Sequence, residues 1–242
     1  MTVMKVLRNL SIVCASLWLA ACSTTGGNPA ANDPYEATNR EIFDFDMRLD
    51  RHVLLPTAAL YAQVVPEPAR DGVHNFLQNL DLPVTFANDL LQGETTRGSE
   101  TFARFFVNTT FGLGGLFDVA TRWGIPNHSE DFGQTLAVWG AGEGPYLVLP
   151  FGGPSNPRDF AGNIIDNAFD PTTYIAYNYK FYWSVGRTLV HVIDVRARSA
   201  SLLQTIERGS VDYYASVRSL YRQNRQNEIN NGKVNLENLP EF

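Results

Sequence analysis

Apolar residues recur along most of the chain at the three- and four-residue spacing of an amphipathic α-helix. The first such segment begins at Asp33-Pro34, because an N-cap residue followed by proline is a typical helix start. Pro56 is expected to end or kink this helix. Its apolar stripe comprises Tyr35, Thr38, Ile42, Phe45, Leu49 and Val53.

Similar patterns predict a second helix after Pro66, a third over 83–92 and a fourth from about Gly98. All are short, strongly amphipathic and rich in aromatic residues. Two interpretations stay open: helices that surround a water-soluble core, and helices that lie in the plane of a membrane interface. No later stretch has the roughly 20 consecutive apolar residues that a simple transmembrane helix needs.

The middle of the chain has a different composition, since 13 of the 19 glycines fall between residues 93 and 162. Gly140, Gly142 and Gly144 come directly before an apolar segment, 146–149, which prolines bound on both sides. The prolines exclude a long helix, so this segment is expected to be extended and to form one arm of a hairpin-like loop. The three alternate glycines provide backbone freedom just before it.

The last third returns to helical periodicity. A helix opens at Asn156-Pro157, a long helix runs to about Arg208, and Gly209 breaks it. Ser210 is then expected to cap a last helix. Six aromatic residues crowd the stretch 174–183, which fits either a membrane-interface belt or a packed corner of the core.

The N-terminal segment predicts a secreted protein with a lipid anchor. Lys5 and Arg8 precede an apolar run that is too short to span a membrane, as in a signal peptide. The run ends in Leu19-Ala20-Ala21-Cys22, a pattern that resembles the bacterial lipobox. Cleavage before Cys22 would make this residue the lipidated N-terminus, and the small polar residues that follow would form a tether.

Composition narrows the function classes. The 242-residue chain is 44% hydrophobic and only 18% charged, and its net charge of -6 argues against a nucleic-acid partner. No disulfide scaffold is expected, because the two cysteines, Cys14 and Cys22, both belong to the N-terminal segment.

No residues single out a catalytic centre. A G-x-S-x-G elbow is absent, and Ser155 lies between prolines in a predicted turn. No histidine has a partner at metal-ligand spacing, so neither metal nor cofactor is expected. Residues 128–131 are interpreted as a solvated loop. The sequence points to binding and passage rather than bond breaking, and we expect no enzyme activity.

Several motifs together resemble one family. Residues 33–43 are similar to the D-P-x-E-x-x-N-R-x-x-[FY] opening of the MlaA family, also called VacJ lipoproteins. Further motifs follow in the family's order at 65–70, 88–93, 104–109, 112–118, 131–136, 144–151 and Arg158-Asp159. The resemblance covers about residues 33–232, nearly the whole chain after the predicted cleavage.

The resemblance implies a mainly α fold: a ring-like bundle of amphipathic interfacial helices with a Gly/Pro-rich loop and a central amphipathic pore. It implies an outer-membrane lipoprotein of a Gram-negative bacterium, embedded from the periplasmic side, that removes misplaced phospholipids from the outer leaflet. The implied partners are phospholipid, a periplasmic lipid-carrier protein (MlaC-like), a trimeric porin and, indirectly, an inner-membrane ABC transporter. Two alternatives stay open, a porin-associated scaffold without a lipid route and a lipid hydrolase with an unrecognised site.

The expected organisation is a signal peptide over 1–21, a lipidated tether over 22–32, a helical domain over 33–232 and a mobile tail over 233–242. The loop with Gly140, Gly142 and Gly144 is expected to be a hinge beside the pore, although a static turn would also use glycine. Two groups of apolar residues complete the expected site. Tyr146, Leu147 and Leu149 are expected to face acyl chains, and Ile42, Phe45 and Leu49 are expected to face the membrane.

Overall fold

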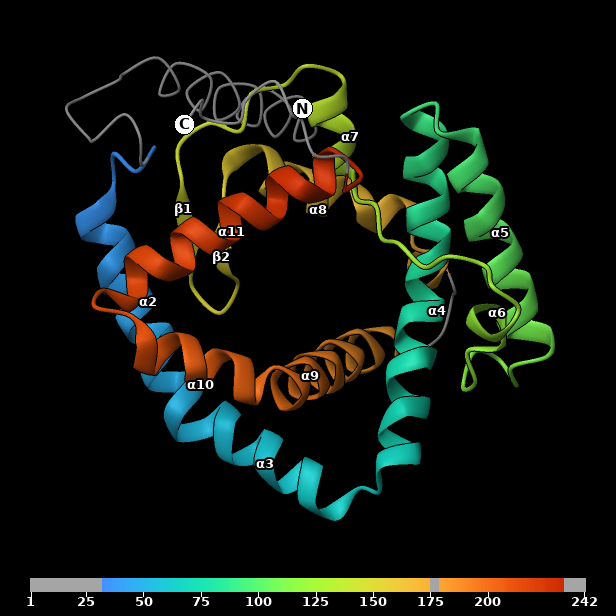
Figure 1. The fold of residues 1–242 in the computed structure, drawn as a ribbon, viewed down its shortest axis with the longest axis horizontal. Coiled ribbons are helices and arrows are strands. Elements are labelled where there is room, and N and C mark those ends of the chain that lie inside the picture. The colour runs from blue at the N-terminus through green and yellow to red at the C-terminus, as the bar shows by residue number, and fades with distance from the viewer. Residues whose placement is uncertain (1–31, 175–178, 233–242) are drawn as a thin grey trace, which may run out of the picture.

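The computed structural model describes residues 32–174 and 179–232, and most of them are helical. The helices follow one another around a ring with a central opening (Figure 1). In chain order the elements are α2 (Glu36–Leu49), the π-helical turn η1 (Asp50–Leu54), α3 (Leu55–Val64), α4 (Glu67–Leu91), α5 (Thr95–Thr110), α6 (Val119–Arg122), α7 (Phe132–Val138), β1 (Leu147–Leu149), β2 (Gly153–Ser155), α8 (Pro157–Phe169), the 3-10 turn η2 (Pro171–Tyr174), α9 (Lys180–Arg198), α10 (Ala200–Gly209) and α11 (Tyr213–Ile229).

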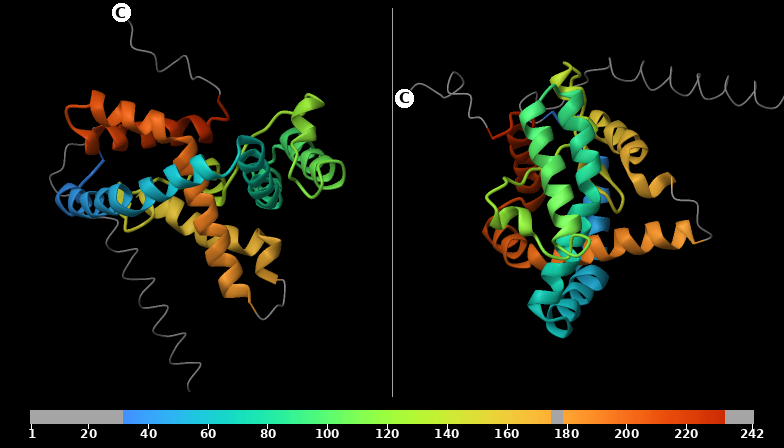
Figure 2. Two further views of the ribbon diagram at one scale, coloured as in Figure 1. Left: turned by 90° about the horizontal axis from the view of Figure 1, so that it is seen from below. Right: turned by 90° about the vertical axis from the view of Figure 1, so that its right-hand side faces the viewer.

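Along parts of the ring, helices pack against one another in pairs, as α4 does with α5 and α3 with α9. α2, α3 and α4 form the outer circuit, α9 and α10 lie inside α3, and α7, α8 and α11 complete the upper side in Figure 1. α5 and α6 are packed on the outside of α4. Figure 2 shows that α8 and α9 extend to one side of the ring plane, while α10 and α11 lie on the other. The mainly helical fold is therefore confirmed.

The first helical segment continues through Pro56, so of the two outcomes that the sequence predicted, an end or a kink, the end does not occur. Pro56 has no N–H to donate, and the turn just before it widens to a π-helix in which the Leu55 N–H bonds to the Asp50 carbonyl. The widened turn accommodates the proline, and helical structure continues to Val64. Val65 is extended, as expected of a residue before proline.

α4 is a single 25-residue helix with Pro83 inside it, so the prediction of two separate helices was wrong. A proline costs the helix one backbone hydrogen bond. The long side-by-side packing of α4 with α5 compensates, because Leu77 and Leu82 are buried and the Asn79 amide bonds to Thr109 at 3.0 Å.

The C-terminal helices also differ from the prediction in their boundaries. The expected long helix breaks at Ser199 into α9 and α10. The last helix is capped by Asp212 rather than Ser210, since the Asp212 carboxylate accepts a hydrogen bond from the Ala215 N–H at 3.1 Å.

The predicted hairpin is confirmed. β1 pairs with β2 in antiparallel register, with Leu147 opposite Ser155 and Leu149 opposite Gly153. Phe151 in the connecting turn has a φ of 64°, an uncommon conformation for a residue with a side chain. In Figure 1 the hairpin extends from the upper side of the ring toward its centre.

The apolar core is small and lies where this hairpin meets α2 and α11. Its buried members are Phe43, Tyr146, Val148 and Tyr214, and the Phe43 and Tyr214 rings meet edge to face at 5.5 Å. Among the described residues, buried polar side chains outnumber buried apolar ones. Hydrogen-bonded and ionic networks therefore hold much of the ring together.

Candidate functional site

An amphipathic cavity lies between the first helical segment (α2, η1 and the start of α3), the C-terminal helices α9, α10 and α11, and the hairpin. Its volume is about 500 Å³, within the range of sites that bind small organic molecules. One part of its lining is apolar and comprises Phe43, Met47, Leu55, Pro154, Leu203, Tyr213 and Val217. The other part is charged or polar and comprises Asp46, Asp50, Arg51, Arg196, Ser201, Gln204 and Glu207.

Two ion pairs cross the cavity wall and join the first helical segment to the C-terminal helices. Arg196 binds Asp50 through two nitrogens, with Nε–Oδ1 at 2.6 Å and Nη2–Oδ2 at 2.9 Å. The hydrogen bond to Asp50 raises the pKa of Arg196 further above its ordinary value. Arg51 on η1 binds Glu207 on α10 at 2.5 Å. These pairs keep α9 and α10 against η1 and so fix one side of the cavity.

The three glycines of the predicted hinge differ in their backbone conformation. Gly140 and Gly144 have φ values of 90° and 71°, which favour glycine, whereas Gly142 has no such φ and open space around it. Glu143 between them is held by an ion pair with Arg222 at 3.1 Å. Nothing in this geometry tests motion, so the hinge stays a prediction.

The apolar strand after these glycines presents two different faces. Tyr146 and Val148 are buried in the small core, whereas Leu147 and Leu149 are half-buried on the opposite face. The structure thus places Tyr146 away from any cargo surface, because its ring packs against Tyr214 at 6.2 Å. The hairpin reaches the cavity with Pro154 of β2, which the sequence did not single out.

The three residues of α2 that were predicted to face the membrane differ in how exposed they are. Ile42 packs against the core, Leu49 is half-buried, and Phe45 is 42% exposed. The Phe45 ring meets Phe151 at the hairpin turn at 5.5 Å. Of the three, Phe45 is the one that offers a large exposed apolar surface. Cys22 lies outside the described residues.

The loop at 128–131 is not the solvated loop that the sequence indicated. His128 Nε2 lies 3.0 Å from Asp89 Oδ1, and Thr101 donates to Asp89 Oδ2 at 2.6 Å. Glu130 is buried and paired with Arg97 at 2.7 Å. His128 and Glu130 are shielded because their partners come from α4 and α5, up to 39 residues away, whereas Ser129 between them is exposed.

A second buried network joins α7, α8 and α11 through Arg225. Its Nη1 and Nη2 both bond to Asp131 at 2.7 Å, and its Nε bonds to Asp159 at 2.9 Å. Burial raises the pKa of both carboxyls, but the hydrogen bonds from Arg225 outweigh it and hold the pKa values below normal. The sequence motifs at 131–136 and Arg158-Asp159 contained two of these residues without revealing their common partner.

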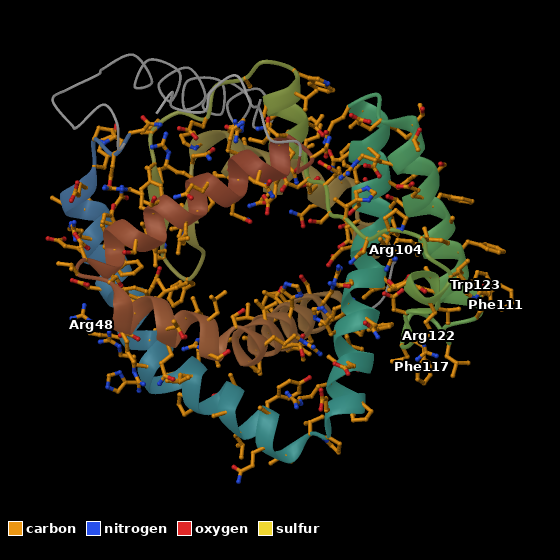
Figure 3. The ribbon with its side chains drawn as sticks, in the orientation of Figure 1. Arg48, Arg104, Phe111, Phe117, Arg122 and Trp123 are labelled. Carbon is orange, nitrogen blue, oxygen red and sulfur yellow. The ribbon has the colours of Figure 1, made fainter. Side chains whose placement is uncertain are left out.

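Aromatic residues gather on the outer side of the ring, around the end of α5 and the short α6. Figure 3 shows Phe111, Phe117 and Trp123 beside Arg122 at the outer edge, away from the central opening. Phe111 is 61% exposed and its ring lies 5.4 Å from that of Trp123, which is 58% exposed. Within the described ranges, no helix has both the length and the apolar character to cross a membrane.

Comparison with known proteins gives a consistent result. The family model described as MlaA lipoprotein matches residues 31–228. The chain is similar to the intermembrane phospholipid transport system lipoprotein MlaA of Escherichia coli, with 34% identity over 245 residues that cover 97% of this chain and 93% of the relative. The protein of the same name from Haemophilus influenzae is 32% identical over 253 residues, with 98% and 97% covered.

A solved structure supports the same relationship. It comes from work on the structural basis for maintenance of bacterial outer membrane lipid asymmetry. The match has a TM-score of 0.74 and 36% sequence identity, and it covers 81% of this chain and 98% of the solved one. Fold and sequence therefore agree on the relatives of this chain.

Proposed function

Since the chain belongs to the MlaA lipoprotein family, we propose that it removes misplaced phospholipids from the outer leaflet of the outer membrane and passes them to a periplasmic carrier. The observation that carries the proposal is the amphipathic cavity between α2, α10, α11 and the hairpin. A phospholipid has a charged head and two acyl chains, so its passage needs polar and apolar surfaces side by side. The cavity offers both, since its lining includes apolar residues such as Phe43 and Leu203 and charged residues such as Arg196 and Asp46.

The proposed position is the inner leaflet of the outer membrane, with Cys22 as the lipidated N-terminus. The exposed aromatic residues near α6 support embedding, because Phe and Trp rings with an adjacent arginine suit the boundary between acyl chains and head groups. The lipobox pattern and the lipoprotein names of the relatives support the anchor.

The proposed partners are an MlaC-like periplasmic carrier, a trimeric porin and an inner-membrane ABC transporter that acts on the carrier. Family resemblance supports these partners, and a scaffold that only held porins would need no amphipathic cavity. A hydrolase would release fatty acid from labelled phospholipid, whereas a transport component would move the lipid intact.

Filling the cavity tests the lipid route directly. Ala200 lines the cavity at the start of α10, and Ala200→Trp would place an indole in the space that a lipid would use. Thr205 lies on the same helix, is exposed and does not line the cavity, so Thr205→Trp is the matched control.

Each variant would replace the chromosomal copy, and outer-leaflet phospholipid would be measured through lipid A palmitoylation. We expect Ala200→Trp to raise the signal toward that of a deletion strain at normal protein level, and Thr205→Trp to leave it at the wild-type level. Wild-type asymmetry in a well-expressed Ala200→Trp strain would refute a route through this cavity.

A further inference from the structure

The aromatic-rich stretch of the sequence lies at the end of a projection from the ring. Figure 2 shows that α8 and α9 leave the ring plane on one side, and that the beginning of α9, drawn in orange, lies far from it. The large side chains at this end are not packed, because Tyr174, Tyr179, Phe181 and Tyr182 are each between 69% and 72% exposed. The stretch is therefore a surface and not a packed corner of the core, which was the other interpretation of the sequence.

The sides of this α8–α9 projection, which comprises residues 164–174 and 179–189, also expose apolar side chains. Ile164 on α8 is 60% exposed, and Leu189 on α9 is 56% exposed. Several large apolar side chains exposed on one part of a protein mark a contact with another protein or with a membrane. The charges of the projection decide between these two kinds of partner.

The charged groups of the projection are paired internally. Arg187 binds Asp170 at 2.6 Å and Asp81 of α4 at 2.5 Å, and the side chains of Arg187 and Asp170 are only 16% and 18% exposed. Asp166 accepts hydrogen bonds from a backbone N–H and from an asparagine amide. Lys180 is the remaining charged residue of this stretch. Lysine suits a lipid boundary, because its stem can lie in apolar surroundings while the ammonium reaches a phosphate. Acyl chains offer no counterion, so a segment that enters them has to pair its own charges.

The opposite side of the ring has a different surface. α11 lies there in Figure 2, and Gln223, Asn224, Gln226 and Asn227 are exposed on it. Amide side chains lose their hydrogen bonds to water when they enter hydrocarbon, so this helix favours an aqueous surrounding. The two sides of the ring plane are therefore suited to different solvents.

Two lengths are consistent with lipid as the partner. Ten residues separate Asn32, where the described structure begins, from the predicted lipidated residue Cys22. At no more than about 3.6 Å per residue, this tether keeps the ring within about 36 Å of the membrane. Eight residues separate Arg187, which is paired with the ring wall, from Tyr179 at the tip. They correspond to about 12 Å of helix, close to the roughly 15 Å of hydrocarbon in one leaflet.

We propose that the α8–α9 projection inserts into the acyl chains of the membrane, with its tyrosines at a head-group boundary and with α11 on the aqueous side of the ring. Tyrosine suits such a boundary, because its ring is apolar and its hydroxyl can bond to water or to head groups. This inference rests on the proposed function, to which it adds the side of the ring that faces the lipid. For a ring in the inner leaflet, the projection then enters the outer leaflet and α11 faces the periplasm.

The test attaches an environment-sensitive fluorophore to single cysteines at exposed positions of the lipidated protein. Phe181→Cys reports on the tip, and Asn227→Cys is the matched control on α11. Phe111→Cys reports on the outer edge of the ring, where the proposed function places lipid as well. The protein without an added cysteine gives the background from native cysteines, and circular dichroism confirms that each variant is folded.

Each labelled protein would be reconstituted into vesicles of phosphatidylethanolamine and phosphatidylglycerol. Fluorescence would be quenched either by iodide in the water or by lipids that carry a nitroxide near the head group or near the end of an acyl chain. We expect the label at position 181 to lose most of its fluorescence to the nitroxide lipids and little to iodide. The nitroxide near the head group should quench it more strongly than the one near the chain end. The label at position 227 should be quenched by iodide and little by either lipid.

The possible failures are distinguishable. Quenching by iodide at position 181 together with quenching by lipid at position 111 overturns the inserted projection but leaves the embedded ring intact. Protection of position 181 from both quenchers means that protein covers the tip, which also overturns the inference. Quenching by lipid at position 227 overturns the assignment of the aqueous side, and stronger quenching of position 181 by the nitroxide near the chain end overturns the position of the tip. Quenching by iodide at all three positions argues against the proposed membrane position itself.

Discussion

The network around Arg225 offers a quantitative test of how the ring is held together. Arg225 is the shared cation for Asp131 at the start of α7 and Asp159 in α8. The side chains of Arg225 and Asp159 are 10% and 7% exposed, and that of Asp131 is 31% exposed. Arg225→Met keeps the helix propensity and much of the side-chain length while removing the charge. Asp131 would then lose the arginine that binds it through two nitrogens, while Asp159 would keep its pair with Arg158 at 3.0 Å.

Breaking a buried ion pair by removing one partner costs about 3–5 kcal/mol. For a chain of this size each kcal/mol lowers the melting temperature by about 2–4 °C, so Arg225→Met should melt roughly 6–20 °C below the wild type. Arg222→Met is the control on the same helix. Arg222 is 34% exposed and pairs with Glu143, and exposed pairs contribute about 0–1 kcal/mol.

The pH dependence gives an independent check. Because the folded pKa values of Asp131 and Asp159 are depressed, their stabilisation is complete above the unfolded value of about 3.9 and is lost as pH falls through the folded values. In Arg225→Met, the pKa of Asp131 rises because this carboxyl stays shielded without Arg225, so its protonation reduces the cost of the substitution at acidic pH. The difference in melting temperature between Arg225→Met and the wild type should therefore be smaller at pH 4 than at pH 7.

Melting would be followed by circular dichroism at 222 nm on full-length protein in detergent, an assay for loss of helix. A melting temperature of Arg225→Met within 2 °C of the wild type at pH 7 would refute the energetic role of this network. If the difference in melting temperature between Arg225→Met and the wild type stays constant with pH, lost packing rather than lost charge causes the destabilisation.

Three further variants test the remaining expectations. Cys22→Ala should leave an unprocessed or mislocalised precursor. Mass spectrometry of the mature N-terminus of the wild type tests the lipid anchor directly, and an N-terminus without lipid would contradict it. The protein without Cys22 should still need detergent or lipid to stay in solution, and Phe45→Asp in the same form should weaken its association with detergent or lipid. If the protein without Cys22 is fully monomeric in detergent-free size-exclusion chromatography, the result argues against embedding. Gly142→Pro should impair clearance of outer-leaflet phospholipid at normal protein level and porin association, and unchanged lipid A palmitoylation would leave the loop as a static turn.

The local sequence pattern predicted those helices and strands whose ends are determined by residues next to them in the sequence. The helix start at Asn156-Pro157 and the extended strand before Pro150 follow from the geometry of proline, and both are present. The predicted start at Asp33-Pro34 is two residues too early, because α2 begins at Glu36 with Tyr35 as its N-cap residue. The prediction failed where tertiary contacts override a local rule. Pro83 lies inside α4 because a neighbouring helix stabilises the helix that the proline weakens.

The candidate site was still less accessible to sequence reasoning. Asp50 and Arg196 are 146 residues apart, and nothing in the spacing of either helix reveals that they meet. Which charges pair with one another depends on the closure of the ring, a property of the whole chain.

The ring architecture itself accounts for the scarcity of buried apolar residues. A ring of helices around a central opening has an outer and an inner surface but little interior. On the proposed function the outer surface meets lipid and the inner surface meets cargo, so large apolar side chains such as Trp123 are used on surfaces rather than in a core. Helix positions within the wall must then be set by directional contacts. Networks such as that of Arg225 provide them, because hydrogen bonds and ion pairs fix register where apolar packing is equally satisfied by lipid.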